Sequence, residues 1–172
     1  NTPIGLSVFA YGAVLGMICA QKGVEIYQLT LMNGFIFAGT SQFIIVDKWN
    51  SISEIFTIVA AALLINLRYF LIGASLNSLF KKSSLRDKFI YMHLVADENW
   101  AVTIERSKRE SITPLFLFGG GICLFSIWSI GTYLGYIFSG FISDPSKYAL
   151  DFAFIAIFTA LCFNLYQGKR NL

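Results

Sequence analysis

The sequence predicts an all-α, polytopic transmembrane helical bundle, and both its composition and the arrangement of its apolar residues support this fold class. Hydrophobic residues make up 56% of the 172 positions and charged residues 13%, against roughly 25% charged in soluble globular domains. The apolar residues stand in long blocks, and most charges fall between the blocks. Because a soluble domain of this size needs a more polar surface, we expect lipid to surround most of the chain.

Five apolar blocks are long enough to cross a bilayer, which takes about 20 mostly apolar residues in a helix. These predicted spans cover residues 4–20, 26–46, 55–80, 115–142 and 148–166. The chain begins at Asn1 instead of Met, and its first block lacks the basic start of a signal peptide. We therefore expect residues 1–172 to be a single transmembrane domain and the chain to be incomplete.

The connection 81–114 separates the third and fourth predicted spans and holds most of the basic residues. These are Lys81, Lys82, Arg86, Lys88, Arg106, Lys108 and Arg109. Basic residues concentrate on the cytoplasmic side of membrane proteins, so we expect this connection inside. If each block crosses once, Asn1 lies outside, and Lys169 and Arg170 lie inside.

Within that connection, residues 89–104 are semi-apolar but contain Asp97 and Glu98. Basic residues flank this segment on both sides, so a crossing here would place one basic cluster outside. We therefore predict a re-entrant or interfacial helix over 89–104.

An internal repeat is suggested by a constant shift along the chain, which aligns Gly12 with Gly131 and Gly16 with Gly135. Three predicted crossings separate the two copies, so the copies would be inverted, a plan that many secondary transporters share. A chance match of apolar sequences is the alternative. An inverted repeat of three-helix units would place a sixth helix after residue 172, so we expect the chain to be incomplete at its C-terminal side.

Arg68 is the only charged residue of the predicted span 55–80 and lies near its middle. An arginine at the bilayer centre costs about 2.5–3.5 kcal/mol on insertion scales, and such residues face the bundle interior or a wet cavity. Arg68 either binds an anionic group or forms a structural ion pair. Asn66 precedes it by about 200° of helix rotation, so the two side chains point to different faces unless the helix unwinds. Asn66 either joins a polar site or makes an interhelical hydrogen bond.

The stretch "NGFIFAGTSQFIIV", Asn33–Val46, places glycines and hydrogen-bonding side chains within one predicted span. Its candidate site residues are Phe37, Gly39, Thr40, Ser41 and Gln42. One interpretation is a helix that breaks at Gly39 and offers free backbone groups near the midplane. The other is a close helix–helix contact, which small residues permit.

Two further stretches contain candidate site residues. In "ADENW", Asp97 and Glu98 are a counter-charge for Arg68, a site for a cationic group, a proton-coupling carboxylate or a solvated acidic pair. In "SIWSIGTYLGYIFSG", Gly131 and Gly135 form a GxxxG pattern that indicates close helix packing. Trp128 either lines a cavity there or packs against its neighbours.

Several function classes lack the residues that they require. His93 is the only histidine, and the three cysteines, Cys19, Cys123 and Cys162, are far apart, so we expect no metal site, no disulfide framework and no cofactor. The sequence contains no Walker A, GxSxG or HExxH motif, so we expect neither an ATPase nor another enzyme. It also lacks a basic run that would favour nucleic acid.

Four motifs in one order connect the chain to a known family. They are "FAGTSQF" (37–43), "INLRYFLIGASL" (65–76), "ADENWA" (96–101) and "DFAFIAIFTAL" (151–161), preceded by "PIGLSVFAYGAVLG" (3–16). The chain resembles the AzlC family of branched-chain amino acid exporters. Gly39 and Gln42 match its FAG…Q motif, Asn66 and Arg68 its N-L-R motif, and Asp97 and Glu98 its D-E motif. The chain departs from the family pattern at Thr40, Ser41 and Tyr69.

The resemblance implies the large permease subunit of an exporter in the bacterial inner membrane. Its substrates would be branched-chain amino acids or methionine, its partner a small AzlD-type membrane subunit, and its mechanism alternating access. Arg68 would bind the substrate carboxylate, Asp97 or Glu98 the ammonium or a coupling proton, and Phe37 the side chain. Gln42 and Asn66 would complete the polar shell. A channel-like pore, and a scaffold whose partner carries the substrate, remain the alternatives.

Overall fold

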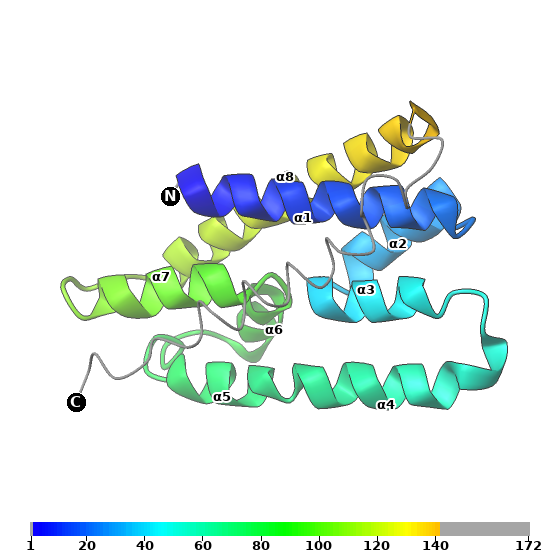
Figure 1. The fold of residues 1–172 in the computed structure, drawn as a ribbon. Coiled ribbons are helices and arrows are strands. Elements are labelled where there is room, and N and C mark those ends of the chain that lie inside the picture. The colour runs from blue at the N-terminus through cyan, green and yellow to red at the C-terminus, as the bar shows by residue number, and fades with distance from the viewer. Residues whose placement is uncertain (1, 142–172) are drawn as a thin grey trace, which may run out of the picture.

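The computed structural model describes residues 2–141, and the predicted span 148–166 lies outside them. All regular elements in the described part are helices, which confirms the predicted all-α class. They are α1 (Thr2–Gln21), α2 (Ile26–Phe35), α3 (Gly39–Asp47), η1 (Ile52–Glu54), α4 (Ile55–Asn66), α5 (Arg68–Ser75), α6 (Leu85–His93), α7 (Asp97–Ser107), α8 (Pro114–Phe138) and η2 (Ser139–Phe141). Figure 1 shows α1, α8 and the α4–α5 pair as the long elements, with the shorter helices between them.

Three helical stretches of residues 2–141 are long and apolar enough to cross a membrane: Ile4–Gln21, Ile55–Ser75 and Pro114–Phe138. The second combines α4 and α5, which follow one another almost in line (Figure 1). The backbone at Leu67, between them, keeps right-handed helical angles (φ −54°, ψ −26°). This stretch is also the most exposed of the three, with Phe56 88% and Phe70 76% accessible.

Helices α1 and α8 cross at two glycine pairs. A Cβ on Gly12 would lie 2.7 Å from the carbonyl oxygen of Trp128, and a Cβ on Gly131 would lie 2.5 Å from that of Phe9. At Gly16 and Gly135 a Cβ would overlap a carbonyl oxygen of the opposite helix. Glycine is therefore required here, because only a hydrogen atom fits between the backbones.

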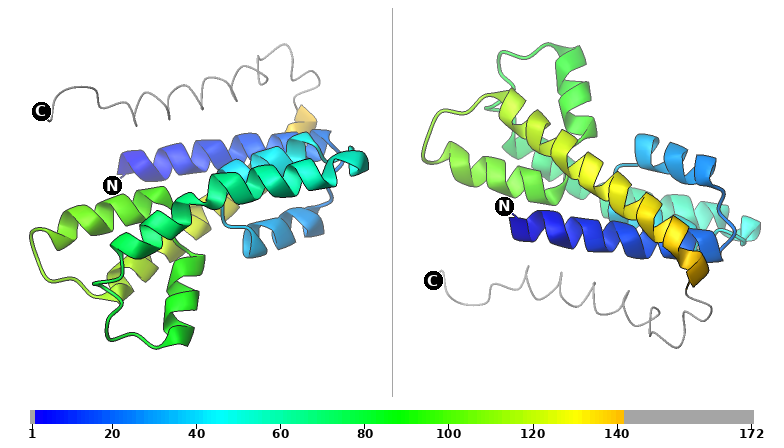
Figure 2. Two further views of the ribbon diagram at one scale, coloured as in Figure 1. Left: turned by 90° about the horizontal axis from the view of Figure 1, so that it is seen from below. Right: turned by 90° about the horizontal axis from the view of Figure 1, so that it is seen from above.

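These contacts also fix the direction of the two helices. Gly12 lies against Trp128 and Gly16 against Thr132, so the residue numbers rise together and the helices run parallel (Figure 2). The glycines that the sequence alignment paired do meet, but the inverted orientation expected for this pair is corrected to a parallel one. The physical reason is that the block 26–46, counted as a crossing, does not cross.

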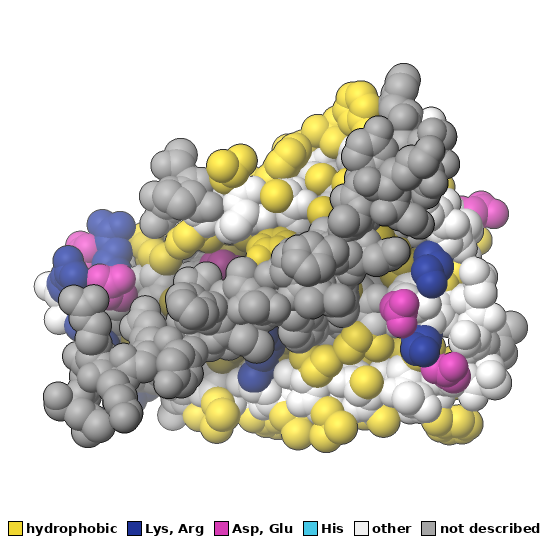
Figure 3. All heavy atoms as spheres, viewed as in Figure 1, with side chains coloured by type: hydrophobic (Ala, Val, Ile, Leu, Met, Phe, Trp, Pro, Cys, Tyr) yellow, Lys and Arg dark blue, Asp and Glu magenta, His cyan; other side chains and the backbone are white. Residues whose placement is uncertain are grey.

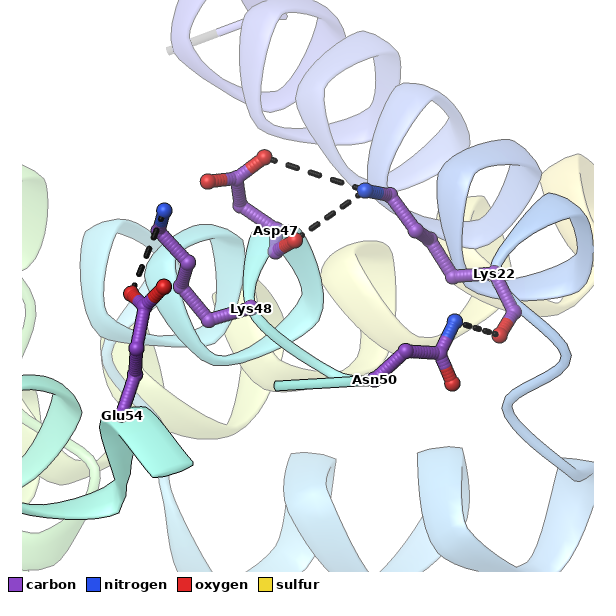
Figure 4. A network of polar contacts seen from close by, with 5 residues as sticks. All are labelled: Lys22, Asp47, Lys48, Asn50 and Glu54. Carbon is purple, nitrogen blue, oxygen red and sulfur yellow. Dashed lines mark hydrogen bonds and ion pairs between the residues drawn. The ribbon is translucent and has the colours of Figure 1, made fainter. Parts of the chain in front are cut away.

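That block forms a helical hairpin, α2–α3, which leaves and returns to the same end of the molecule. The Lys22 ammonium donates to the backbone carbonyl of Asp47 at 3.0 Å, and the Asn50 amide donates to the carbonyl of Lys22 at 3.4 Å (Figure 4). The residues before α2 and after α3 are therefore neighbours. The predicted crossing over 26–46 is corrected to this first hairpin, residues 26–47, which breaks at residues 36–38.

A second hairpin, α6–α7 (residues 85–107), replaces the single helix predicted over 89–104. Its break covers residues 94–96. Ser75 at the end of α5 and Ser78 just after it line one surface depression with Lys108 and Arg109, which follow α7, so this hairpin also leaves and returns to one end. It is the end opposite to Lys22, because α4–α5 runs between the two (Figure 1).

The start of α1 lies at the same end as the second hairpin. Ile4 and Gly5 line a cavity together with Leu115 and Phe116, which follow the connection 81–114. The expectation that the chain start and this connection lie on opposite sides is therefore corrected. It counted the first hairpin as a crossing.

Two apolar clusters hold the helices together. One joins α1, the first hairpin and α8 around Leu15, Leu29, Val46 and Trp128. The other joins α5, the second hairpin and α8, and its buried residues are Ile72, Leu76, Phe80, Val95 and Leu117. Figure 3 shows hydrophobic side chains along the elements between two charged ends, an arrangement that suits a lipid bilayer.

Candidate functional site

The broken tips of the two hairpins meet near the centre of the molecule. His93, the last residue of α6, lies 2.8 Å (Nε2) from the carbonyl oxygen of Gly34 near the end of α2. Next to this contact, α3 begins at Gly39 and α7 begins at Asp97. Both helix N-termini border one cavity of about 120 Å³.

This central cavity contains most of the residues that the sequence singled out. Seven of them line it: Phe37, Gly39, Thr40, Arg68, Asp97, Glu98 and Trp128. The rest of its wall consists of Val8, Tyr11, Ala38, Phe43, Tyr69, Ala96 and Leu124. The cavity therefore combines charged groups from α5 and α7 with apolar walls from α1, α3 and α8.

Gln42, Ser41 and Asn66 do not line the cavity. Gln42 is fully buried, and its amide nitrogen donates to the carbonyls of Ile36 at 2.8 Å and Met32 at 3.1 Å. The Met32 carbonyl lies in the last turn of α2 and the Ile36 carbonyl at the break that follows it, where they also accept from the backbone N–H groups of Ile36 and Ala38, respectively. Gln42 therefore stabilises a break next to Gly39, which was one of the two interpretations of the sequence.

Ser41 and Asn66 connect two helices. The Asn66 amide on α4 donates to the Ser41 hydroxyl on α3 at 3.0 Å. This is the interhelical hydrogen bond that the sequence left as an alternative for Asn66. It also fixes the rotation of α4–α5, and with it the direction in which Arg68 enters the cavity.

A buried polar network attaches the first hairpin to α8. The Trp128 indole N–H donates to Gln42 Oε1 at 3.0 Å and to Asn33 Oδ1 at 3.3 Å. The Asn33 amide donates to the Thr132 hydroxyl at 2.8 Å. With its polar edge held in this way, the Trp128 ring covers Gly39, where a Cβ would lie 2.9 Å from the indole. Sequence analysis did not select Asn33 or Thr132 as site residues, although a buried Asn in an apolar block was a usable signal.

Arg68 and Asp97 form an ion pair across the cavity. Their side chains are 36% and 44% accessible, so neither charge is sealed from a ligand. The guanidinium carbon also lies 5.3 Å from the ring centroid of Tyr69, and its Nε is buried without a hydrogen-bond partner in the described part of the chain.

Glu98 is the second carboxylate at the start of α7. It lines the central cavity, and the described residues provide it with no ion pair of the kind that Asp97 makes. Burial raises the pKa of its carboxyl group, its own backbone N–H lowers it, the neighbouring Asp97 carboxylate raises it and Arg68 lowers it. The pKa therefore lies above its ordinary value, with burial as the main cause.

The second break is stabilised by Asn99, a residue that sequence analysis missed. Its amide nitrogen donates to the carbonyls of Leu94 at 3.0 Å and Leu117 at 3.2 Å. Its amide oxygen accepts from the backbone N–H of Ala96 at 2.8 Å. Asn99 thereby fixes the position of Asp97 and Glu98, which precede it in the same helical turn.

The comparisons with known proteins show the family of the chain. The model of the family described as AzlC protein matches residues 3–142. The chain belongs to the AzlC family. Curated relatives include membrane proteins of uncharacterized function from two Helicobacter pylori strains. The J99 protein is 25% identical over 98% of this chain and 73% of its own length, and the 26695 protein is 25% identical over 96% and 72%.

An Archaeoglobus fulgidus membrane protein of uncharacterized function is also similar, with 26% identity over 98% of this chain and 74% of that protein. No solved structure matches. The family match, the relatives named as membrane proteins and the three apolar helical stretches together identify a membrane protein of the AzlC family.

Proposed function

We propose that this AzlC-family protein exports branched-chain amino acids, with methionine as a further substrate, by alternating access around the central cavity. The observation that supports this proposal is the composition of that cavity. It places the Arg68–Asp97 ion pair, the Glu98 carboxylate and two helix N-termini within apolar walls. An α-amino acid needs this combination, because its negative carboxylate and its positive ammonium are attached to the same carbon.

The carboxylate of the substrate would bind at Arg68 and at the start of α3. A guanidinium binds a carboxylate through two parallel hydrogen bonds. The first N–H groups of a helix have no partner within that helix and carry partial positive charge. Helix α3 starts at Gly39 without a side-chain cap, so these groups are free to add to the Arg68 contact.

The ammonium of the substrate would bind at the carboxylates of α7, and its side chain would contact the apolar wall. Phe37, Phe43 and Leu124 belong to that wall. Arg68 and Asp97 neutralise each other. A zwitterion that enters between them supplies each with a new partner, so no charge is left uncompensated, which would be costly in a partly dry site.

Efflux from cells loaded with dipeptides of the candidate substrates tests this proposal. Wild type, Arg68→Ala and Arg68→Lys are compared at matched membrane abundance. Arg109→Ala serves as the control, because Arg109 is exposed at the end of the molecule and pairs with Glu105. We expect both Arg68 variants to lose export and the control to keep it. Normal export by both variants would contradict the proposed site, and no export of any of these amino acids by wild type would contradict the substrate class.

The same proposal includes a location and a partner. It places the protein in the bacterial inner membrane with a small AzlD-type membrane subunit. The exposed apolar surface of α4–α5 is available for such a subunit or for lipid. Co-expression of both chains, followed by affinity purification of one, should recover the other, and export should need both. Full export by the large chain alone would contradict the requirement for a partner.

A further inference from the structure

We infer that Glu98 is the residue that binds and releases the proton coupled to substrate movement, and that Asp97 instead remains the counter-charge of Arg68. This inference rests on the proposed function, because it assigns the coupling step of the same site. The sequence alone gave these two adjacent carboxylates the same set of possible roles. The structure separates them by their surroundings.

The first difference is the partner of each carboxylate. Asp97 pairs with Arg68, so its negative charge is compensated before any substrate binds. Glu98 lies one residue later on α7, and among the described residues it has no such ion pair. A carboxylate without a fixed counter-charge in a partly buried place gains a proton more readily than its paired neighbour.

The second difference is position. Glu98 lines the central cavity and also a second cavity of about 430 Å³ between the starts of α1 and α8 and helix α7. Ile4, Val102 and Phe116 are among the apolar residues of the second cavity. Glu98 is the only charged residue among the described residues that line it. Glu98 is therefore the charged residue that the substrate site shares with the cavity near the end of the molecule that holds the basic connection 81–114.

None of the titratable groups of the described residues around Glu98 replaces it as the proton-binding residue. Arg68 and Tyr69 face it from α5, Asp97 precedes it on α7, and Tyr11 of α1 lines the same central cavity. Helix α8 contributes the Cys123 thiol through the second cavity, and the cavity-lining residues of α3 are not titratable. Arg68 is the one cation of this group, and Asp97 already occupies it. Burial raises the pKa of the Glu98 carboxyl group.

In the coupling step the substrate ammonium and the proton compete for the Glu98 carboxylate. When Glu98 is ionised, it attracts the substrate ammonium and completes the site. When the O–H bond forms, the carboxyl group becomes neutral and the ammonium loses that partner. Substrate entry therefore releases the Glu98 proton to water through the second cavity, and proton binding favours substrate release. No electron transfer or further reactant is involved, and the result is an exchange of a proton for an amino acid.

The experiment measures two forms of leucine transport by the full protein, with its partner subunit where one is needed, in liposomes. Equilibrium exchange of labelled leucine needs no net proton movement, whereas leucine movement driven by an imposed pH gradient does. We expect Glu98→Gln to exchange leucine more slowly than wild type, because a neutral amide is a weaker partner for the ammonium, at a rate that no longer changes with pH, and to lose about tenfold or more of the pH-driven transport. Glu98→Asp, which keeps the carboxyl group, should retain pH-driven transport at a lower rate.

Asp97→Asn should lose both activities, because Arg68 then lacks its counter-charge. Glu105→Gln on the exposed face of α7 is the matched control and should keep both. A second measurement, independent of transport, records proton release when leucine is added to weakly buffered protein in detergent. Wild type should release protons and Glu98→Gln should not.

These outcomes separate the inference from the proposed function. Exchange of leucine by wild type together with pH-driven transport and proton release in Glu98→Gln would overturn the role of Glu98 and leave the proposed function intact. Loss of exchange in Glu98→Gln at normal abundance would also overturn it, because Glu98 would then be a binding group only. Failure of wild type to exchange or bind any branched-chain amino acid would instead overturn the proposed function.

Discussion

The two hairpins, residues 26–47 and 85–107, have the same backbone arrangement but differ in the charge of the helical turn that reaches the cavity. They enter from opposite ends, break at residues 36–38 and 94–96, and place the N-termini of α3 and α7 at one cavity. A buried amide side chain holds each break, Gln42 in the first hairpin and Asn99 in the second. Helix α3 then starts with uncharged residues, whereas α7 starts with two carboxylates.

This comparison separates what the backbone supplies from what the side chains supply. The repeated break places two helix N-termini, which carry partial positive charge, at the depth where a substrate must bind. The different first turns of α3 and α7 give the two sides of the cavity different charge preferences. Arg68 and α3 favour an anionic group on one side, and Asp97 and Glu98 favour a cationic group on the other. A site of this kind suits a zwitterion better than an ion of either sign.

The largest expected effect comes from the crossing of α1 and α8, on which both hairpins depend. Gly16→Ala and Gly135→Ala each place a Cβ on a carbonyl oxygen of the opposite helix. Forcing α1 and α8 apart should cost about 1–3 kcal/mol or more, and it should reduce the yield of folded protein in membranes. Gly119→Ala in α8 is the control, because a Cβ there meets no atom within 4 Å. Equal yields for all three variants, measured by size-exclusion fluorescence, would show that folding does not depend on the close crossing of α1 and α8.

The next effect tests whether both breaks depend on their amides. Gln42→Leu removes the donor to Ile36 and the acceptor of the Trp128 indole. Asn99→Leu leaves the backbone N–H of Ala96 and the carbonyl of Leu94 without this partner. Each change should lower the free energy of unfolding by on the order of 1–3 kcal/mol, since buried polar groups are expensive to leave unpaired.

Gln28→Leu is the matched control for these amide variants. Gln28 accepts one exposed bond from the backbone N–H of Glu25, so its loss should cost less. Thermal unfolding in detergent measures the difference. A Gln42→Leu protein as stable as wild type would contradict the role of this amide in the first break.

A smaller effect concerns the apolar wall of the cavity. Gly39→Ala places a Cβ 2.9 Å from the Trp128 ring and should push the indole toward the substrate space. A change of one methyl group in a tight pocket alters binding by about 10–200-fold, and we expect leucine affinity to fall near the lower limit. Gly34→Ala in the same hairpin meets no atom within 4 Å and should bind leucine as wild type does. Equal affinities of the two variants would place the ligand away from Trp128.

The smallest expected effect is the pH dependence of stability. The pKa of Glu98 is raised by burial, so the folded state binds this proton more tightly than the unfolded state does. Stability from this group is therefore full below the ordinary carboxyl pKa, about 4.3, and declines as the pH rises through the folded-state pKa. Melting curves across that range should decline less in Glu98→Gln than in wild type, with Glu105→Gln as the control. Parallel curves for wild type and Glu98→Gln would contradict the raised pKa.

Sequence alone predicted the features that depend on local composition. It gave the helical membrane class and the possibility of a break at Gly39, and it named Asp97 as a possible counter-charge for Arg68. A glycine followed by hydrogen-bonding side chains within an apolar block carries that local signal.

The features that were missed depend on distant contacts. Hydropathy cannot distinguish a block that crosses from one that enters and returns, so the first hairpin was counted as a span. The direction of the α1–α8 pair followed from that count. The role of Asn99 depends on the carbonyl of Leu94 in the second break and that of Leu117 in α8, which become neighbours only in the folded chain. The division of roles between Asp97 and Glu98 likewise needed the position of the two cavities.

The most direct test of the central claim compares three ligands that differ only in their charged ends. Leucine carries both groups, leucinamide lacks the carboxylate, and 4-methylpentanoate lacks the ammonium. Binding to the purified protein is measured by calorimetry at one pH. If Arg68 with α3 and the carboxylates of α7 recognise the two ends of a zwitterion, leucine binds and both analogues bind at least about tenfold more weakly, because each leaves a site group unpaired. Equal binding of all three ligands, or of leucine and either analogue, would contradict a site built from two oppositely charged halves.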